Sequence, residues 1–308
     1  MHDSSARYAV GDLVPPPYYF DELPEGLQKA AFDDPFNTPG WIDHCRHAAR
    51  KLGIRHSAYL GRTRQSRVRR ALAAAVSYAR SPALVKQALL SGGGCSRHLQ
   101  PIASMITDVH LRDGKVSVLD VGGGFGDNFF ELLRVIDPEV ARALRYEIVD
   151  NEPSCALGRE LFAGYEIQPA FTSDHTSLTG PYDIVMMIGT LQYLPEWRRT
   201  LGSIVDRAAR YSFIARSPIV EGTSFTTTQH ICPAYGSFAR RSLGATQINV
   251  VGLSDLRKVM GNGQWRPMME WLDTDYSPQF ARLPERRRGA AYYVMAWARE
   301  PAVGLGGA

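Results

Sequence analysis

The sequence predicts an α/β fold in which buried strands alternate with helices. The first strand is the apolar run VSVLDV at 116–121, a composition typical of a parallel strand buried on both faces. A glycine-rich turn follows, and DNFFELL at 127–133 has the apolar side and the capping residues of a helix. A second strand at 145–151, a helix at 154–163 and the buried run YDIVMMI at 182–188 continue the alternation.

Four glycines lie within five positions after the first strand: Gly122, Gly123, Gly124 and Gly126. Without side chains, the backbone can turn sharply and approach a ligand closely. Dinucleotide-binding loops have the spacing G-x-G-x-x-G, but position 127 is Asp and the run is D-x-G-x-G-x-G, starting at Asp120. We therefore expect a ligand site here; the competing interpretation is a glycine-rich turn of another doubly wound protein.

The D-x-G-x-G-x-G run resembles the first motif of class I S-adenosylmethionine-dependent methyltransferases. The segment DIVMMIGTLQYL at 183–194 resembles the fourth motif of that class. The phrases GTLQYL, FIARSPI and TTTQH are similar to a methyltransferase subfamily of bacterial polysaccharide and secondary-metabolite pathways. The resemblance covers about residues 116–299 and implies a Rossmann-like sheet of seven strands, the last one antiparallel.

The resemblance implies S-adenosylmethionine as cofactor and S-adenosylhomocysteine as product. Asp150 ends the second strand, where a carboxylate can accept hydrogen bonds from both ribose hydroxyls, although a strand-end turn residue is the alternative. Ser173 and Asp174 are expected at the adenine, although SDHTS is also good turn chemistry. The cofactor residues implied are Asp120, Gly122, Gly124 and Gly126 for the methionine half, Asp150 for the ribose, Ser173 and Asp174 for the adenine, and Gly189, Thr190 and Gln192 under the sulfonium, together with Gly123 and Asn151.

This sequence departs from the subfamily at two places: Asp150 stands where many members have Glu, and Gly189-Thr190 replaces a pair of serines. The remaining strands are expected at 211–216, 264–272 and 290–299, the last two forming an antiparallel pair that closes the sheet. The segment 221–263, between the strands at 211–216 and 264–272, has few strand signals, so we expect a long loop there. We expect this loop to bind the substrate, because long loops in compact domains tend to be functional.

The chain is expected to divide into a mainly helical region at 1–98, a catalytic domain at 99–302 and a flexible tail at 303–308. Helices are predicted at 41–52, 66–90 and 99–110, with a short one near 26–32, and the proline-rich arm at 1–40 is expected to pack against another part of the protein. In this class, a helical N-terminal extension commonly covers the substrate pocket. The same region is the candidate for homodimer formation.

The composition is that of an ordinary globular protein, with 35 basic and 31 acidic residues and a net charge of +4. This charge is too mild to indicate a nucleic acid or a membrane as partner. Five arginines between 62 and 70 are interpreted as a solvated helix face rather than a polyanion site. With no leader and no apolar run of roughly 20 residues, a cytoplasmic enzyme is expected. The four cysteines are expected to be reduced, and no metal site is predicted.

Methyl transfer from a sulfonium is an in-line displacement, so the enzyme must align the nucleophile and exclude water. His230 is the leading candidate for a general base, since imidazole titrates near neutral pH, and a loop histidine bonded to the backbone is the alternative. Arg216 would pair with a substrate carboxylate or phosphate, or brace the loop. Tyr193 and Tyr235 would line the pocket, with core packing as the alternative for Tyr193.

The expected function is methylation of a small-molecule hydroxyl or carboxyl oxygen in a natural product or saccharide. Methylation of carbon or nitrogen is the first alternative. A nucleic-acid methyltransferase is disfavoured, because IGTLQY replaces the N-P-P-Y type of turn after the fourth strand. A noncatalytic cofactor-binding scaffold ranks last, because the motifs are intact.

Overall fold

The computed structural model describes residues 45, 46, 48, 97–194, 196–231, 244–261, 264–273, 283, 285 and 289–299, together with the backbone of 19–21. At 230, 231, 244 and 245 only the backbone is described. Tyr235, the predicted helices at 26–32 and 66–90, the arginine cluster and the tail at 303–308 lie outside these residues. Of the predicted helix at 41–52, positions 45, 46 and 48 are described, and all three are helical.

Seven of the described strands form a central sheet with the order β4-β3-β2-β5-β6-β10-β9. Neighbours from β4 to β6 are parallel, whereas β10 is antiparallel to both β6 and β9. The predicted Rossmann-like sheet with an antiparallel last strand is thus confirmed. The strands are β2 (Val116–Val121), β3 (Leu144–Val149), β4 (Ala170–Thr172), β5 (Tyr182–Ile188), β6 (Ala208–Val220), β9 (Trp265–Leu272) and β10 (Ala291–Arg299).

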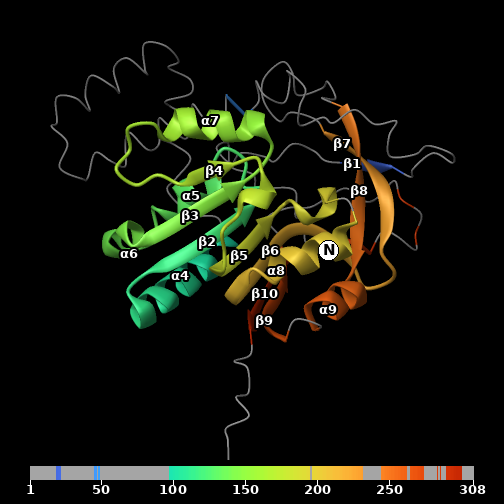
Figure 1. Ribbon diagram of the computed structural model, residues 1–308. Coiled ribbons are helices and arrows are strands. Elements are labelled where there is room, and N and C mark those ends of the chain that lie inside the picture. Colours follow the sequence, from blue (N-terminus) through green and yellow to red (C-terminus); the bar gives the residue numbers. More distant parts are fainter. Residues whose placement is uncertain are drawn as a thin grey trace, which may run out of the picture.

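Helices cover both faces of this sheet (Figure 1). Alternate residues of β2 enter different cores: Val116 and Val118 join one cluster with Phe129 and Phe162, whereas Leu119 joins a second cluster with α8 and α9. On the first face lie α4 (Leu99–Asp113), α5 (Asp127–Leu132), α6 (Pro138–Arg142) and α7 (Glu152–Phe162), and on the second α8 (Trp197–Val205) and α9 (Leu253–Gly261).

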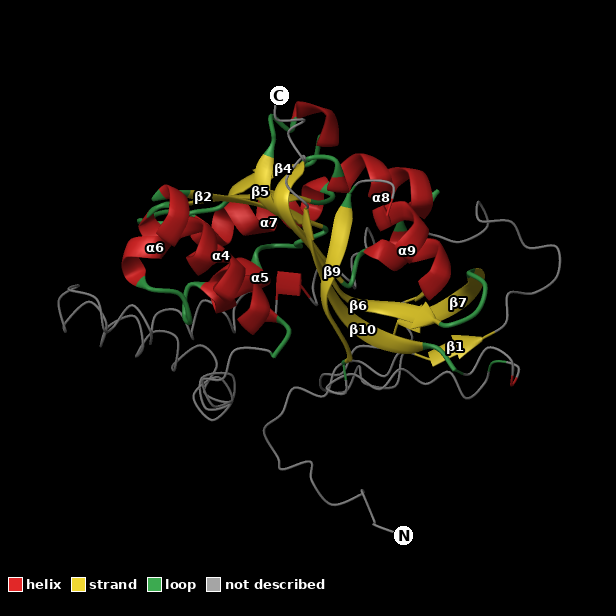
Figure 2. Cartoon of the chain, turned by 90° about the horizontal axis from the view of Figure 1, so that it is seen from below, coloured by secondary structure: helices red, strands yellow, loops and turns green. Residues whose placement is uncertain are grey.

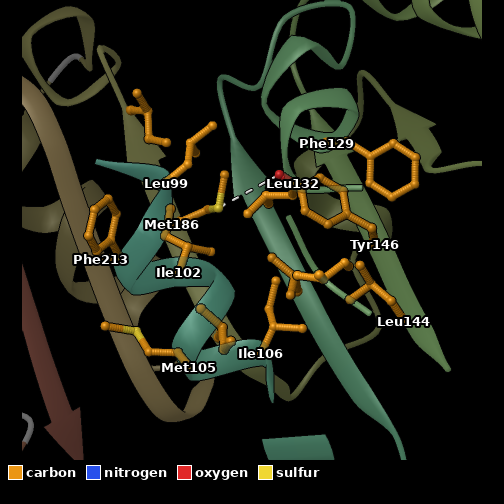
Figure 3. Close-up of a cluster of buried hydrophobic side chains, with 14 of the residues drawn as sticks. Leu99, Ile102, Met105, Ile106, Phe129, Leu132, Leu144, Tyr146, Met186 and Phe213 are labelled. Atoms are coloured by element: carbon orange, nitrogen blue, oxygen red, sulfur yellow. Dashed lines mark hydrogen bonds between the residues drawn. The ribbon is translucent and has the colours of Figure 1, made fainter. Parts of the chain in front are cut away.

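Helix α4 illustrates how the sequence builds this packing. Its buried residues Leu99, Ile102, Met105 and Ile106 recur at helical spacing and point toward the sheet in Figure 3, in the same cluster as Tyr146 of β3. Gly114 ends the helix in the left-handed conformation, with φ of 70°, and its N–H bonds to the carbonyl of His110. The helix predicted at 99–110 is therefore confirmed and extends one turn further.

The prediction of a long loop at 221–263 is wrong. The structure forms β7 (Phe225–Ile231), β8 (Gly244–Gly252) and α9 there. The three threonines of FTTTQHI are polar, but they are also β-branched and therefore favour a strand. Strand β8 pairs with β7, which in turn pairs with β1 (Tyr19–Asp21), so part of the predicted N-terminal arm does pack against another segment.

Strands β1, β7 and β8 form an additional sheet beside the central one. Strand β6 connects the two sheets. Its end, at Ile219 and Val220, pairs with β8 while most of its length pairs with β10. In Figure 2, β6 and β10 run out of the central sheet toward β7 and β1. The additional strands therefore extend the sheet from the end of β6.

The connection from β4 to β5 is short, and in it the structure has only the 3-10 turn η3 (His175–Ser177) rather than an α-helix. The adjacent strand β3 shows the consequence, because Arg145 on its second face is exposed. Its guanidinium lies 5.0 Å from the centre of the Tyr182 ring, and the Tyr182 hydroxyl donates to Glu147 at 2.7 Å. This part of the second face thus has a polar surface beside the amino ends of β2 and β3.

Candidate functional site

A cavity of about 380 Å³ lies at the carboxyl ends of β2, β3, β5 and β6. Such a crevice at the ends of parallel strands is where α/β sheets usually bind ligands. The structure brings together in its wall nine residues predicted from the sequence: Gly122, Gly123, Gly124, Asp150, Asn151, Gly189, Thr190, Tyr193 and Arg216.

The glycine loop needs its glycines for two physical reasons. Gly122 and Gly124 have φ of +72° and +57°, a region that side chains rarely adopt. A Cβ on Gly122 would lie 2.2 Å from Oγ1 of Thr190, and one on Gly123 would lie 2.5 Å from Oδ2 of Asp120. Gly126 does not line the cavity; a Cβ there would lie 2.8 Å from the Phe162 ring. The last glycine therefore permits core packing, whereas the first three form the cavity floor.

Asp150 closes the loop from the side of β3. Its Oδ2 accepts the N–H of Gly124 at 2.7 Å, and its Oδ1 accepts the N–H of Asn151 at 2.6 Å. Asn151 caps α7, since its side-chain oxygen accepts the N–H of Ser154 at 3.0 Å. The carboxylate is thus held at the tip of the strand, on the wall of the cavity.

A second cavity, of about 690 Å³, adjoins the first at Asp150. It shares Gly122, Asp150 and Thr190 with the first, and its other walls include the apolar side chains of Leu178 and Leu194. The short connection between β4 and β5 contributes His175 to it. Asp150 therefore stands between two adjoining hollows, one floored by the glycine loop and one mainly apolar.

Ser173 and Asp174, predicted at the adenine, line neither cavity. Both are exposed; the Ser173 hydroxyl donates to Glu152 at 2.7 Å, and Asp174 accepts the N–H of Thr176 at 2.8 Å as the cap of η3. Hydrogen bonds from the Thr176 hydroxyl, which contributes most, and from the Thr176 N–H hold the pKa of Asp174 below its usual value. In this structure the pair acts as turn residues, the alternative that the sequence left open.

Asp120 lies beneath the glycine loop and is fully buried, so it does not line the cavity. Its Oδ2 accepts the Tyr146 hydroxyl at 2.8 Å and the Asn128 amide at 3.3 Å. Burial raises the pKa of Asp120 to about 7, against the opposing effect of these two donors. Figure 3 shows the Tyr146 side chain among the core residues, where its hydroxyl also approaches the Met186 sulfur at 3.7 Å.

Gln192 and Tyr193 lie in the 3-10 turn η4 (Leu191–Tyr193) after β5. The first cavity, which the glycine loop lines, is called the main cavity below. Gln192 is buried and does not line the main cavity, and its amide donates to the carbonyl of Gly189 at 2.9 Å. Tyr193 lines the cavity, and its hydroxyl donates to Oε1 of Gln229 in β7 at 2.8 Å. Burial raises the pKa of Tyr193 to about 12. The additional sheet thus contacts the wall of the site through Gln229.

Arg216 occupies an unusual backbone position in β6. On one side Ser217 pairs with Tyr293 and on the other Ala215 pairs with Val294, so Arg216 is the extra residue of a β-bulge. Its φ is +52°, a conformation that costs roughly 1–3 kcal/mol for a residue with a side chain. The bulge places Arg216 on the wall of the main cavity.

The structure describes His230 only as backbone, paired in β7 with Tyr19 and Ala245. Its assignment as a general base, and the role of Tyr235 outside the described residues, stay predictions.

Seven cavity residues were missed by the sequence analysis: Cys45, Ala48, Phe125, Asp127, Asn128, Ser154 and Ile188. Cys45, which belongs to the N-terminal region, lines the cavity together with Ala48, three positions later; the predicted helix at 41–52 was the available signal. Asp127 also lines the cavity, directly after the glycine loop. The available signal was that Asp stands there in place of the third glycine of G-x-G-x-x-G. Burial raises the pKa of Asp127, and the charge of Arg216 opposes that shift.

In the described part of the chain, no helix is long and apolar enough to cross a membrane. The same residues include no group of three or more His, Cys, Asp or Glu side chains able to hold a metal ion. Cys45 and Cys155 are free thiols.

No protein-family model matches the chain, and no curated protein matches it. Among solved structures, it is similar to magnesium protoporphyrin IX methyltransferase from Synechocystis PCC 6803, at 17% identity over 89% of this chain and 100% of that chain, with a TM-score of 0.44. It is also similar to 1,6-didemethyltoxoflavin-N1-methyltransferase from Burkholderia thailandensis, at 16% identity over 74% and 85% of the two chains, with a TM-score of 0.43. The chain itself has the seven-stranded Rossmann-like sheet with an antiparallel last strand that is expected from its sequence.

Proposed function

We propose that the chain is an S-adenosylmethionine-dependent methyltransferase that acts on an oxygen of a small-molecule acceptor. The observation that carries the proposal is the position of Asp150, whose carboxylate stands between two cavities and is fixed by the N–H of Gly124 at 2.7 Å. S-adenosylmethionine has an amino acid on one side of its ribose and a nucleobase on the other. A carboxylate that can hold the ribose hydroxyls, with a hollow on each side, fits this arrangement.

The two hollows also differ in the way that the cofactor requires. The glycine loop offers a bare backbone to the methionine half in the first cavity, whereas Leu178 and Leu194 offer an apolar surface to the adenine in the second. We therefore assign the adenine to the second cavity, near His175, rather than to Ser173 and Asp174. A dinucleotide fits less well, because its pyrophosphate at the loop would meet the negative charge of Asp127.

The acceptor is assigned to the side of the main cavity formed by Gly189, Tyr193 and Arg216. The cofactor supplies an electrophilic methyl group, and the chain's residues need to align the nucleophile with it and exclude water. Tyr193 would orient the nucleophile by hydrogen bonding. Because its pKa is about 12, it would not remove a proton near neutral pH. Arg216 would attract an anionic group on the acceptor.

A hydroxyl acceptor must lose its proton, and His230 is our proposed base. Methylation of an acidic carbon or of an amine would use the same cavity with less need for a base. His230→Ala should therefore lower turnover with a hydroxyl acceptor by roughly 100-fold or more. Near-normal turnover in that variant would favour the carbon or nitrogen alternative.

Titration calorimetry tests the cofactor assignment directly. We expect the chain to bind S-adenosylmethionine and S-adenosylhomocysteine but not NAD, and Asp150→Ala to lose that binding. Asp206→Ala is the matched control, because Asp206 is exposed at the end of α8 and lines neither cavity. Binding of NAD alone, or equal affinity in Asp150→Ala and Asp206→Ala, would contradict the proposal.

A further inference from the structure

The second cavity is larger than adenine requires. Its volume of about 690 Å³ lies within the range of roughly 300–1,000 Å³ in which proteins bind a whole drug-sized ligand. Adenine is one part of the proposed cofactor, whose ribose is assigned to Asp150 and whose methionine half is assigned to the main cavity. With adenine bound, the second cavity therefore keeps room for a further group.

The extra room follows from the short connection between β4 and β5. Parallel strands are usually joined by a helix, in a crossover of about a dozen residues or more. Here residues 173–181 form the turn η3 and no α-helix. The cavity takes its wall from one side of α8 instead. The residues on that side are Arg199, Thr200, Ser203 and Ile204, at helical spacing, with Glu196 before the helix and Arg207 after it.

The lining residues come from both ends of the central sheet. Gly122 and Asp150 lie at the carboxyl ends of β2 and β3. The carbonyl of Arg207 accepts the N–H of Tyr182, the first residue of β5, so Arg207 lies at the amino end of that strand. The ribose is attached to the five-membered ring of adenine. With the ribose at Asp150, the six-membered ring and its amino group therefore face away from Asp150, into the remaining part of the cavity.

This remaining part combines apolar walls with a positive charge. Leu178, which is 9% exposed, and the half-buried Ile204 supply apolar surface. The Arg207 guanidinium donates from Nη1 to the carbonyl of Leu178 at 3.0 Å, and this bond holds it at the cavity wall. Among the residues that the structure describes, no carboxylate lies within 4 Å of this guanidinium. An apolar group that ends in an anion complements these walls.

We propose that the part of the second cavity lined by Ser203, Ile204 and Arg207 is a further ligand subsite, which accepts an apolar substituent on the six-membered ring of adenine and favours one that ends in a carboxylate. The inference rests on the proposed function. A close-packed wall at the edge of the adenine would exclude such a substituent, because well-packed side chains yield little to added volume. The chain should thus bind adenine-substituted forms of the cofactor as well as the parent compound.

Titration calorimetry with two ligands tests the subsite. S-adenosylhomocysteine is the parent ligand, and N6-benzyl-S-adenosylhomocysteine adds an apolar ring to the amino group of its adenine. The wild type should bind the two with affinities that agree within about 10-fold. Ser203→Trp, which fills the subsite from α8, should weaken binding of the benzyl derivative by roughly 10-fold or more and leave binding of the parent unchanged.

Asp206→Trp is the matched control. Asp206 is exposed at the end of the same helix and lines neither cavity, so this variant should bind both ligands as the wild type does. Should Ser203→Trp not fold, Ser203→Phe is judged by the same two ligands.

A loss of more than about 10-fold on benzylation in the wild type would overturn the inference, since the edge of the adenine would then be closed. Equal affinity of Ser203→Trp and Asp206→Trp for the benzyl derivative would do so as well, because the substituent would lie elsewhere. An equal loss of both ligands in Ser203→Trp would contradict a subsite separate from that of adenine. If the wild type does not bind the parent ligand, it is the proposed function that fails.

A third ligand, N6-(4-carboxybenzyl)-S-adenosylhomocysteine, tests the role of Arg207. Its carboxylate should raise the affinity above that of the benzyl derivative by roughly 5-fold, as for a favourable ion pair open to solvent, and this advantage should shrink as the salt concentration rises. Arg207→Gln should remove the advantage and leave binding of the benzyl derivative unchanged. The absence of any advantage in the wild type, or its persistence in Arg207→Gln, would remove Arg207 from the subsite.

Discussion

The hydroxyl of Tyr193 donates a hydrogen bond of 2.8 Å to Gln229, and this bond joins the turn after β5 to the additional strand β7. Tyr193 lines the main cavity, while Gln229 is 1% exposed. The wall of the site and the strands inserted after β6 are therefore connected through a partly buried polar contact, which makes the position of the Tyr193 ring depend on β7.

Gln229→Leu should lower the free energy of unfolding by about 1 kcal/mol, because the partly buried hydroxyl of Tyr193 loses this acceptor. Tyr193→Phe should cost a similar amount for the converse reason. The double variant should cost clearly less than the sum of the two, as expected for residues that form one hydrogen bond. Urea denaturation measures all three, and strictly additive losses would show that the two side chains are not coupled.

Gly122→Ala should destabilise the chain by roughly 1–3 kcal/mol and weaken cofactor binding, because φ is +72° and the new Cβ would lie 2.2 Å from Oγ1 of Thr190. Gly202 in α8 is the matched control, since no atom lies within 4 Å of its Cβ position. Gly202→Ala should stabilise the helix by about 0.5–1 kcal/mol. Thermal unfolding and calorimetry with S-adenosylhomocysteine distinguish the two variants, and equal stability would refute the steric argument.

Asp120 should make the stability of the chain depend on pH. Burial raises its pKa from 3.8 to about 7 in the folded state, so the folded chain holds this proton more tightly than the unfolded chain. Its contribution to stability is complete below about pH 4 and is lost as the pH rises to about 7. Asp120→Asn should remove this dependence and gain stability relative to wild type over that interval.

Urea denaturation at pH 4, 5.5 and 7 checks this prediction, with the exposed residue Asp206 changed to Asn as control. A difference between Asp120→Asn and wild type that stays constant with pH would contradict it. The Asp120 carboxylate lies directly behind Gly123 and costs stability at neutral pH. This cost indicates that Asp120 has a role in shaping the glycine loop rather than in stabilising the fold.

Cys45→Trp should weaken binding of S-adenosylhomocysteine at least 10-fold, because the larger side chain would enter the main cavity that Cys45 lines. Cys155→Ser is the control, since that buried thiol lies outside both cavities. Calorimetry measures the affinity and circular dichroism the folding. Wild-type affinity in a folded Cys45→Trp would show that the N-terminal region does not form part of the ligand site.

The sequence predicted the part of the fold in which local signals agree. The strands at 116–121 and 182–188 have the expected bounds, because buried apolar runs bounded by glycine or proline leave few alternatives. The segment 221–263 was misread because Thr226, Thr227 and Thr228 combine a polar side chain with a preference for strands. Burial of Thr227 in the additional sheet depends on contacts made far along the chain.

In the candidate site too, the residues with local sequence signals were predicted and those placed by long-range packing were not. The residues of the loop and of the strand tips, such as Gly122 and Asp150, are placed by motif and topology together, and the structure brings them to one cavity. Ser173 and Asp174 were assigned to the adenine by their place after a strand, but they bond to Glu152 and Thr176 and line neither cavity. Cys45 enters the cavity from outside the motifs, so its place depends on tertiary packing that no local pattern reports.

The bulge at Arg216 also determines which way the rest of β6 faces. Successive side chains of a strand point to opposite faces, so one extra residue reverses the alternation for everything after it. Beyond the bulge, Ile219 joins the core around α8 and α9, and Val220 joins the core of the additional sheet. Deleting position 216 would exchange these two orientations. A single-residue deletion there would therefore disrupt two hydrophobic cores, whereas Arg216→Ala would leave both intact and remove only the guanidinium.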